Sequence, residues 1–457
     1  MMNIREFVEA TKASYKGEEL AFTGITTDSR AVQQGELFLA LVGGNFDGHN
    51  FCRQALESGA VAVVVSHLVE AVPIEKQILV QDTLAAYQQA AAAYRNKCAQ
   101  AKGLKVIGIT GSNGKTSTKD LLAACLSTKY KVVKTQANYN NEIGLPKTLF
   151  TIQEDTDIAV VEMGMRGLGQ IRELCQIAHP DSGIISNVGE THMELLGSMD
   201  NIGLAKSEIV EDLPAEGYAV LNGDNAYVRR AAGKTKAKVI YFGLGEDCDY
   251  RGSEITTSCM STSFTCTEKA TGKSVRVRLQ LMGEHNVYNA LSALATAAAY
   301  GVDMEEAAKA LATARLTSSR QEIIYIGDLT FINDAYNASP ASMEAALKTL
   351  AEAGRSSGNA RTIAVLADML ELGAVSEGSH INVGRQAWEN KISYLLTYGK
   401  EAKYISDEFV KLGGSGQHCA DRQEAAAVLR TLATAGDIIL LKGSNSMQVG
   451  KLLELFK

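Results

Sequence analysis

One stretch constrains the fold more than any other, VIGITGSNGKTSTKD at residues 106–120. Its first residues, Val106 to Thr110, are apolar and partly β-branched, which favours a buried strand. Small residues follow from Gly111 to Gly114, and a helix is expected to begin near Lys115. A strand, a glycine turn and a helix N-terminus form a phosphate site, because backbone N–H groups and the positive end of the helix dipole converge there.

This loop predicts the binding of a nucleoside triphosphate. We expect Lys115 to reach the β- and γ-phosphates and the Thr116 hydroxyl to hold Mg2+. The spacing is the short form TGSNGKT, because Ile109 stands where the general GxxxxGK[ST] pattern has glycine. A plain strand–turn–helix with a solvated lysine is the alternative, and the coincidence of strand, glycine pair and Lys-Thr disfavours it. The residues expected to line the phosphates are Gly111, Ser112, Asn113, Gly114, Lys115, Thr116 and Ser117.

The composition narrows the class of protein. A chain of 457 residues, 46% of them hydrophobic, is expected to fold into two to four domains. A net charge of −7, with no basic run interleaved with aromatics, argues against a nucleic-acid surface. The N-terminal residues are expected to be neither a signal peptide nor a membrane span. Eight cysteines without a CxxC pair favour reduced thiols over disulfides or a zinc site. We therefore expect a cytoplasmic protein, and a monomer.

The order of apolar segments predicts three α/β domains. A small α/β domain is expected at 1–102, and a central domain with the phosphate loop and a mostly parallel sheet at 103–315. A Rossmann-like α/β domain is expected at 316–457. In that last domain RTIAVLADML, KISYLLTYG and GDIILLKGS read as strands that alternate with helices, which predicts a parallel sheet with helical crossovers.

Three polar residues follow the phosphate loop at positions suited to metal chemistry. Glu162 stands near the end of a predicted buried strand, and ligands of doubly wound sheets lie outside the carboxyl ends of the strands. A carboxylate there is positioned for Mg2+, although a salt-bridged glutamate is the structural alternative. His192 is expected in a loop at the same sheet edge, where a lone histidine is more often structural. Lys206 is not a Mg2+ ligand as such, so a solvated helix charge is its plain interpretation.

Several amide and charged residues are weaker candidates. Asn286 and Asn289 share a face near the start of a predicted helix and could read an adenine edge, or serve as a cap and a surface amide. The polar stretches around 26–38 and 43–51, and the asparagines near 138–141, have ordinary turn chemistry as their alternative. Asp334 and Arg320 could face a cleft or form structural ion pairs.

Taken together, these strings resemble the Mur ligase family. The motifs that carry the resemblance run over nearly the whole chain and are TDSRAVQQGELFLALVG, FDGHNF, TGSNGKTSTKD, NYNNEIGLPKTL, VVEMG, SNVGETHMELLGS, AKSEI, GEHNVYNALSALA, DAYNASPASM and LLKGSNSM. NYNNEIG and DAYNASP favour the family member that adds D-alanyl-D-alanine. Many short motifs in the family's order are more specific than one phosphate loop.

The resemblance implies an ATP-dependent amide ligase of peptidoglycan precursor synthesis. The first domain would bind a UDP-sugar, the second ATP, and the third would close over both. ATP would phosphorylate the carboxylate of UDP-N-acetylmuramoyl-tripeptide. The amine of D-alanyl-D-alanine would then displace phosphate from the acyl phosphate. Bringing two anions together needs cations, which Mg2+, Lys115 and the helix N-terminus would supply.

The resemblance also assigns roles to single residues. Thr116 and Glu162 would bind one Mg2+ and His192 a second. Lys206 matches a family lysine that reacts with CO2, and its carbamate would support the second Mg2+. The remaining assignments place Asn286 and Asn289 at adenine, Asp334 at ribose, Arg320 at the ATP phosphates, Ser29, Arg30 and His49 at the uridine diphosphate, and Asn140 and Asn141 along the substrate channel.

The sequence departs from the family pattern at two positions of the third domain. Ser339 stands where Asn is common, and Asn445 where Arg is common, so the contacts to the dipeptide are left open. Two alternative functions remain, a folylpolyglutamate synthase-like ligase and a non-ligating ATP-binding switch. The region before the phosphate loop disfavours the first. Glu162, His192 and Lys206 together disfavour the second, because a switch needs no second metal site.

Overall fold

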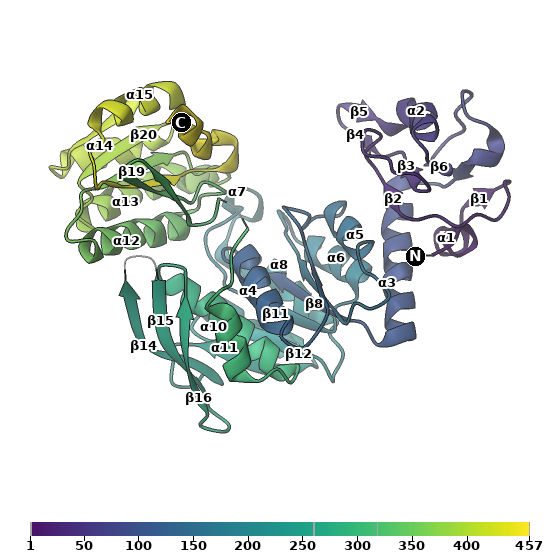
Figure 1. Cartoon of the computed structure of the whole chain (residues 1–457), viewed down its shortest axis with the longest axis horizontal. Helices are drawn as coiled ribbons and strands as arrows, with labels where there is room; N and C mark the ends of the chain where they lie inside the picture. The colour runs from purple at the N-terminus through teal and green to yellow at the C-terminus, as the bar shows by residue number, and fades with distance from the viewer. Residues whose placement is uncertain (1, 259–260, 318, 457) are drawn as a thin grey trace. The chain divides into compact units, whose positions relative to one another are not determined.

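The structure is a computed structural model that describes residues 2–258, 261–317 and 319–456 (Figure 1). The chain divides into two compact units. The first unit consists of Met1–Gly108, Tyr130–Met165 and Gly169–Ser182, and the second of Ile109–Lys129, Arg166–Leu168 and Gly183–Lys457. No helix in the described part of the chain is long and apolar enough to cross a membrane.

The N-terminal part of the first unit is built on a five-stranded sheet with the order β1-β7-β6-β3-β2. Strands β2, β3, β6 and β7 are parallel neighbours, and β1 pairs antiparallel with β7. The strands are β1 Ser14–Tyr15, β2 Ile25–Thr26, β3 Leu37–Leu39, β6 Ala62–Val65 and β7 Gln77–Leu79, with a small hairpin of β4 Val42–Gly43 and β5 Phe46–Asp47. The helices are α1 Ile4–Thr11, η1 Gly48–Phe51, α2 Cys52–Glu57, η2 Ile74–Lys76 and α3 Thr83–Lys102.

A second sheet has nine strands in the order β16-β15-β14-β13-β12-β11-β8-β10-β9. The pairs β9–β10, β12–β13 and β13–β14 are parallel, whereas β14, β15 and β16 form an antiparallel meander. Its strands are β8 Lys105–Thr110, β9 Val132–Lys134, β10 Ile158–Glu162, β11 Ser182–Ile185, β12 Tyr218–Asn222, β13 Lys238–Gly243, β14 Tyr250–Ser258, β15 Ser261–Glu268 and β16 Ser274–Leu279. The helices along this part of the chain are α4 Lys115–Leu126, α5 Gly144–Leu149, α6 Gln170–Ala178, α7 Met193–Leu196, α8 Met199–Glu211, α9 Ala226–Arg229, η3 Arg230–Lys234, α10 Glu284–Ala299 and α11 Met304–Leu311.

The C-terminal part of the second unit contains a six-stranded sheet with the order β17-β18-β22-β19-β20-β21. The hairpin β17–β18 is antiparallel and all other pairs are parallel, as the alternation of strands and helices predicts. Its strands are β17 Glu322–Ile326, β18 Leu329–Asn333, β19 Thr362–Ala367, β20 Tyr394–Tyr398, β21 Gly416–Cys419 and β22 Ile438–Lys442. The helices are α12 Pro340–Ser356, η4 Gly373–Val375, α13 Ser376–Glu389, α14 Ala402–Lys411, α15 Arg422–Leu432, η5 Asn445–Met447 and η6 Val449–Leu455.

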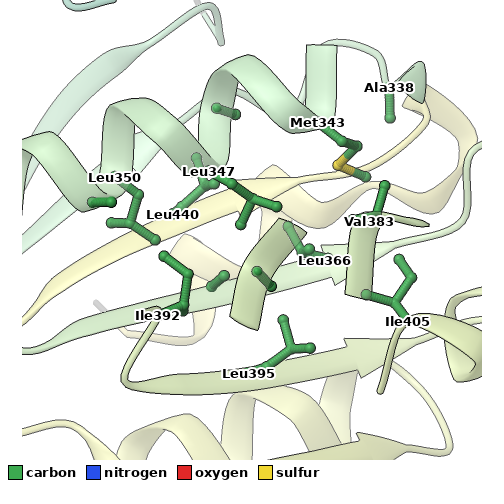
Figure 2. Packing of buried hydrophobic residues seen from close by; sticks show 14 of the residues in the cluster. Ala338, Met343, Leu347, Leu350, Leu366, Val383, Ile392, Leu395, Ile405 and Leu440 are labelled. Atoms are coloured by element: carbon green, nitrogen blue, oxygen red, sulfur yellow. The ribbon is translucent and has the colours of Figure 1, made fainter. Parts of the chain in front are cut away.

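Both faces of this sheet are buried, because its strands are apolar on both sides. Ala364 and Leu366 of β19 face a core shared with α12, α13 and α14, whereas Ile363 and Val365 face a core shared with α15 and η6. Figure 2 shows the first core, where helical side chains pack over Leu366, Leu395 and Leu440 of three parallel strands. Continuous apolar strands of this kind are typical of parallel sheets covered by helices.

Candidate functional site

The phosphate loop has the predicted strand–turn–helix form. Strand β8 ends at Thr110 and helix α4 begins at Lys115. Gly111 and Gly114 have φ values of +151° and +81°, which residues with a side chain rarely adopt. A Cβ at Gly111 would overlap the Ser186 hydroxyl, and one at Gly114 would overlap the Asn289 amide oxygen. Both glycines of TGSNGKT are therefore required by local packing.

The segment after β11 holds this loop in place. Ser112 N donates to the carbonyl of Asn187 at 3.0 Å, and Asn113 N donates to the Asn187 side chain at 2.8 Å. The Ser186 hydroxyl donates to the carbonyl of Asn113 at 2.6 Å. The Ser112 hydroxyl and Gly189 are joined by two hydrogen bonds of 2.9 Å. The loop is thus preorganised by the SNVGET segment, which the motif itself does not reveal.

Two lysines give the loop a strongly positive environment. Lys115 Nζ donates to the carbonyl of Gly111 at 2.7 Å, so its ammonium lies over its own loop. The Lys206 side chain, on α8, is 2% exposed and has no hydrogen-bond acceptor or counter-ion among the described residues. Burial lowers the pKa of Lys206 well below its ordinary value, and the charge of Lys115 lowers it further. Burial thus favours the neutral form of this amine, which is the nucleophilic form.

His192 lies immediately before α7 with a φ of 56°. Its Nδ1 atom is 2.7 Å from Oε2 of Glu371, although the approach is not aligned as a hydrogen bond. Burial lowers the pKa of His192, the Glu371 carboxylate opposes this shift, and the charges of Lys206 and Lys115 add to it.

Glu162 is the last residue of β10, as predicted, and only 2% exposed. Its Oε1 accepts a hydrogen bond of 2.8 Å from the Asn140 side chain, and its backbone N donates to the Thr135 hydroxyl at 3.0 Å. Asn141 instead accepts from Gly144 N at 2.9 Å and so orders the start of α5. Within the first unit, Asn140 therefore contacts the predicted metal carboxylate, whereas Asn141 performs a capping task.

Asn286 and Asn289 share one face of α10 and are both buried. Their amides bond to each other, since Asn289 Nδ2 donates to Asn286 Oδ1 at 3.0 Å. Asn286 also donates to Gln321, and Asn289 accepts from Thr118 of α4. Contact with adenine would require exchange of some of these bonds, so the adenine role stays a prediction.

Two further candidates come from the region around β18. Asp334 is paired with Lys442, with 2.6 Å between Oδ2 and Nζ. The Arg320 guanidinium lies 3.8 Å from the centre of the Tyr336 ring, and its buried Nε has no hydrogen-bond partner among the described residues. A guanidinium with an unused donor suits an anionic ligand. The ribose and phosphate roles of these residues remain predictions.

The candidates of the N-terminal part are held by local contacts. Arg30 is exposed and forms a two-point ion pair with Asp28, next to the half-buried Ser29. His49 is buried, with its Nδ1 at 2.6 Å from Asp47 and its Nε2 accepting from Ser66 N at 2.9 Å. His49 is therefore structurally engaged, and no contact in the structure tests its role, or that of Ser29 and Arg30, toward a nucleotide sugar.

Sequence reasoning missed three contributors to this region. Glu371 contacts His192, Lys442 pairs with Asp334, and the Ser339 hydroxyl donates to the phosphate-loop residue Asn113 at 3.0 Å. All three belong to the C-terminal part of the chain. Glu371 and Lys442 lie at or just beyond the carboxyl ends of parallel strands, the edge at which ligands bind in α/β sheets. The same rule, applied to the third sheet, would have marked Glu371 and Lys442 as candidates from the sequence.

The donor groups fit Mg2+ held together with a nucleotide. No group of three or more His, Cys, Asp or Glu side chains forms a metal cage among the described residues. Mg2+ is usually bound by one or two carboxylates, water and substrate phosphates, not by a complete protein cage. Thr116 and His192 of the second unit carry donor groups of that kind, and Glu162 of the first unit is, by itself, a buried carboxylate.

Comparison with known proteins agrees with this organisation. Three family models match in succession, a Mur ligase family catalytic domain at 21–107, a Mur ligase middle domain at 109–297 and a Mur ligase glutamate ligase domain at 319–445. The chain is 39% identical to the UDP-N-acetylmuramoyl-tripeptide–D-alanyl-D-alanine ligase of Bacillus subtilis, over 99% of this chain and 97% of that protein.

Solved structures show the same likeness. Crystal structure I of MurF from Acinetobacter baumannii is 31% identical, covers 99% of this chain and 98% of its own, and has a TM-score of 0.89. MurF ligase from Thermotoga maritima in complex with ADP is 26% identical over 95% and 96% of the two chains, with a TM-score of 0.81. The predicted three-domain α/β fold is confirmed, while the boundaries near 102 and 315 stay predictions. On these findings, the chain belongs to the Mur ligase family.

Proposed function

We propose that this chain joins D-alanyl-D-alanine to UDP-N-acetylmuramoyl-tripeptide at the expense of ATP, in the synthesis of peptidoglycan precursors. The observation that carries the proposal is the full-length match to the Bacillus subtilis ligase of that name. The phosphate loop and the cationic groups around it supply the chemistry that such a reaction needs. The ADP complex of the Thermotoga maritima structure supports ATP as the nucleotide.

The reaction must turn a carboxylate into an electrophile. A carboxylate oxygen of the tripeptide attacks the γ-phosphorus of ATP, the bond to ADP breaks, and an acyl phosphate forms. The amine of D-alanyl-D-alanine then attacks the acyl carbon and loses a proton, and phosphate leaves with the original carboxylate oxygen. The first step brings two anions together, so electrostatic stabilisation and positioning are the main contributions of the protein.

The phosphate loop provides the anion site for this step. The loop of residues 111–117 would hold the phosphates at the N-terminus of α4, and Lys115 would exchange its bond to the Gly111 carbonyl for a phosphate oxygen. Thr116 and Glu162 would hold one Mg2+, which supplies charge neutralisation at the phosphates. Arg320 adds a guanidinium, Asp334 binds ribose, and Asn286 and Asn289 face adenine.

Lys206 acts as an anion after reaction with CO2. Its lowered pKa favours the neutral amine, which attacks the carbon of CO2 and loses a proton to give a carbamate. The carbamate, together with His192, would hold a second Mg2+, and the metal would then be the counter-ion of the buried group. The carbamate would thus account for both features of this residue, its burial and its lack of an acceptor among the described residues.

The proposal extends to the substrate end. Ser29, Arg30 and His49 lie at the uridine diphosphate, and Asn140 and Asn141 line the path to the tripeptide carboxylate. We further propose domains at 1–102, 103–315 and 316–457, and a cytoplasmic monomer. The free cysteines among the described residues accord with a reducing compartment. A folylpolyglutamate-type ligase and a non-ligating switch are both disfavoured by the full-length match to tripeptide ligases.

An omission assay tests the proposal. Release of ADP and phosphate from ATP is measured with UDP-N-acetylmuramoyl-tripeptide and D-alanyl-D-alanine, each left out in turn, and the pentapeptide product is followed by mass. We expect equal amounts of ADP, phosphate and pentapeptide when both substrates are present. ATP turnover that is indifferent to both substrates would contradict ligation.

A further inference from the structure

Two loops with unusual backbone conformations meet at the predicted metal histidine. His192 and Glu371 both have left-handed φ values, 56° and 65°, which are uncommon for residues other than glycine and asparagine. Their side chains approach to 2.7 Å. Such conformations cost free energy and cluster where the surrounding structure holds a side chain in a required position. The contact between two such residues therefore indicates that the positions of both side chains matter.

The backbones of these loops are also in close contact. A Cβ at Gly373, whose φ is +56°, would lie 3.1 Å from the Cα of Glu194 in α7. Glycine at 373 allows the loop of residues 370–375 to approach the residues that follow His192. An exposed ion pair between mobile side chains would not need this approach of one backbone to another.

Hydrogen bonds among the segments that follow β19 and β22 and helix α13 fix the loop that carries Glu371. The fully buried His380 accepts from Met369 N at 3.0 Å through Nε2, and its Nδ1 lies 2.8 Å from the carbonyl of Ser376. Leu370 N donates to the Ser444 hydroxyl at 2.9 Å. Contacts on both sides of Glu371 thus determine where its side chain begins.

We propose that Glu371 is a positioning residue that holds the His192 imidazole with a proton on Nδ1 and leaves Nε2 for the metal. Histidines that bind metals commonly donate their other ring N–H to a carboxylate, which fixes the tautomer and the ring orientation. The second carboxylate oxygen, Oε1, lies 3.8 Å from the Arg166 guanidinium. The Arg166 guanidinium thus approaches the carboxylate oxygen that does not face His192.

The proposed role requires a reorientation of the carboxylate, because Nδ1 and Oε2 are 2.7 Å apart without the alignment of a hydrogen bond. The Glu371 side chain is 45% exposed, so it can rotate over the short distance that a linear hydrogen bond requires. Hydrogen bonds of this kind are often poorly aligned without substrate and tighten in the loaded enzyme. The arrangement makes the orientation of His192 depend on the C-terminal part of the chain, since the loop of residues 370–375 follows β19.

The test uses variants chosen for backbone tolerance. E371N removes the carboxylate and shortens the side chain, while asparagine still tolerates a left-handed φ better than most residues with a side chain. E371Q keeps an acceptor oxygen at the same distance. E377Q, at an exposed acid six residues further along the chain, is the matched control. Thermal unfolding first establishes that all three variants are folded.

The primary readout is the ring tautomer of His192 in the metal-free protein, measured from 15N shifts of labelled histidine and assigned with H192Q. We expect Nδ1–H in the wild type, in E371Q and in E377Q, and a shift toward Nε2–H in E371N. In ATP turnover, we expect E371N to raise the Mg2+ concentration for half-maximal rate about 10- to 100-fold, as for other outer partners of metal ligands. E377Q should leave it unchanged.

The outcomes separate this inference from the proposed function on which it rests. Unchanged 15N shifts in E371N would overturn the positioning role. A changed tautomer with an unchanged Mg2+ dependence would overturn its link to the metal. Absence of ligation by the wild type would overturn the proposed function, while a tautomer shift in E371N would still support the contact between Glu371 and His192.

Discussion

The side chains that follow β8 in the central sheet differ in charge from those that follow β18 and β19 in the third sheet. Beyond β8 lie the N-terminus of α4 and the ammonium of Lys115, and Lys206 of α8 is a buried amine. The third sheet presents Asp334, Asp368 and Glu371 beyond β18 and β19. Each of these acids has a protein partner. Asp334 pairs with Lys442, Glu371 approaches His192, and Asp368 accepts three hydrogen bonds from the backbone N–H groups of residues 400–402.

This difference indicates that the region beyond β8 binds a ligand, whereas the acids of the third sheet hold neighbouring segments of the chain in place. Beyond β8, the ammonium of Lys115 and the N-terminus of α4 attract an incoming anion. In the third sheet the acids are compensated already, and they hold loops and neighbouring elements in place. Two sheets of similar topology thus have different roles because the charged residues at one edge differ. Function is in general set by such sites and not by the fold.

Loss of Lys206, for which we propose a carbamate, should have the largest effect on activity. We expect K206A and K206R to reduce phosphate release about 10³-fold or more, because each removes a charge-stabilising group from the phosphate site. Added bicarbonate should not restore either variant. K236A, at an exposed lysine, is the control. Full activity of K206R would contradict the carbamate, since a guanidinium cannot replace it.

A methyl group in the phosphate loop should have the next largest effect. In G114A the new Cβ overlaps the Asn289 amide oxygen at a φ of +81°. We expect ATP affinity to fall about 10- to 100-fold, because a small displacement of positioned groups has effects of this size. G272A has a similar φ of +71° but open space around its Cβ, so it isolates backbone strain. Nucleotide titration calorimetry on both variants measures the difference, and equal ATP affinities would count against the packing argument.

Removal of a compensated acid should change stability more than chemistry. D368A leaves three backbone N–H groups at the start of α14 without their acceptor. We expect the free energy of unfolding to fall by about 1–3 kcal/mol, the cost of unsatisfied buried donors. D407A, at an exposed acid of α14, should have little effect. A large loss of activity in D368A at unchanged stability would place Asp368 in the reaction and blur the contrast between the two edges.

The smallest expected effect concerns acid stability at the junction of α10 and the third sheet. Burial lowers the pKa of His285 to about 4, with Asp334 opposing and Lys442 adding to the shift. Its Nε2 lies 3.1 Å from the Gln321 amide nitrogen, from which a neutral ring accepts. The folded state therefore binds fewer protons than the unfolded state between about pH 4 and the ordinary value of 6.5.

The sign of this effect follows directly. Stability from neutral His285 is fully present above pH 6.5 and is lost as the pH falls toward 4. We expect a loss of about 1–2 kcal/mol over that window, allowing for the partial exposure of the ring. Denaturant unfolding of the wild type and H285Q as a function of pH measures it, with H67Q as an exposed control. A wild-type pH dependence identical to that of H285Q would rule out this contribution.

The local structure was predictable wherever short-range chemistry decides it. The strand, glycine turn and helix of residues 105–126 and the hairpin β17–β18 follow from periodicity and turn residues. Ser339 caps α12 with Pro340 in its first turn, as capping preferences predict. The position of Glu162 at the end of β10 follows from the burial of its strand.

Contacts between distant segments could not be derived in the same way. The bond between Asn286 and Asn289 depends on how α10 packs on the phosphate loop, and the approach of Glu371 to His192 joins loops far apart in the chain. Both depend on tertiary packing, about which residue periodicity carries no information. The family motifs identified the chemistry of the central edge, whereas the compensated acids of the third sheet became apparent from the structure.

The central claim is that the triphosphate at the loop of residues 111–117 is directed at a carboxylate. The most direct test labels the free carboxylate of the tripeptide substrate with 18O and measures the mass of the released phosphate. Transfer through an acyl phosphate places one substrate oxygen in each phosphate formed, in proportion to the pentapeptide produced. Phosphate free of 18O, in a reaction that still makes pentapeptide, would contradict activation of the carboxylate by ATP.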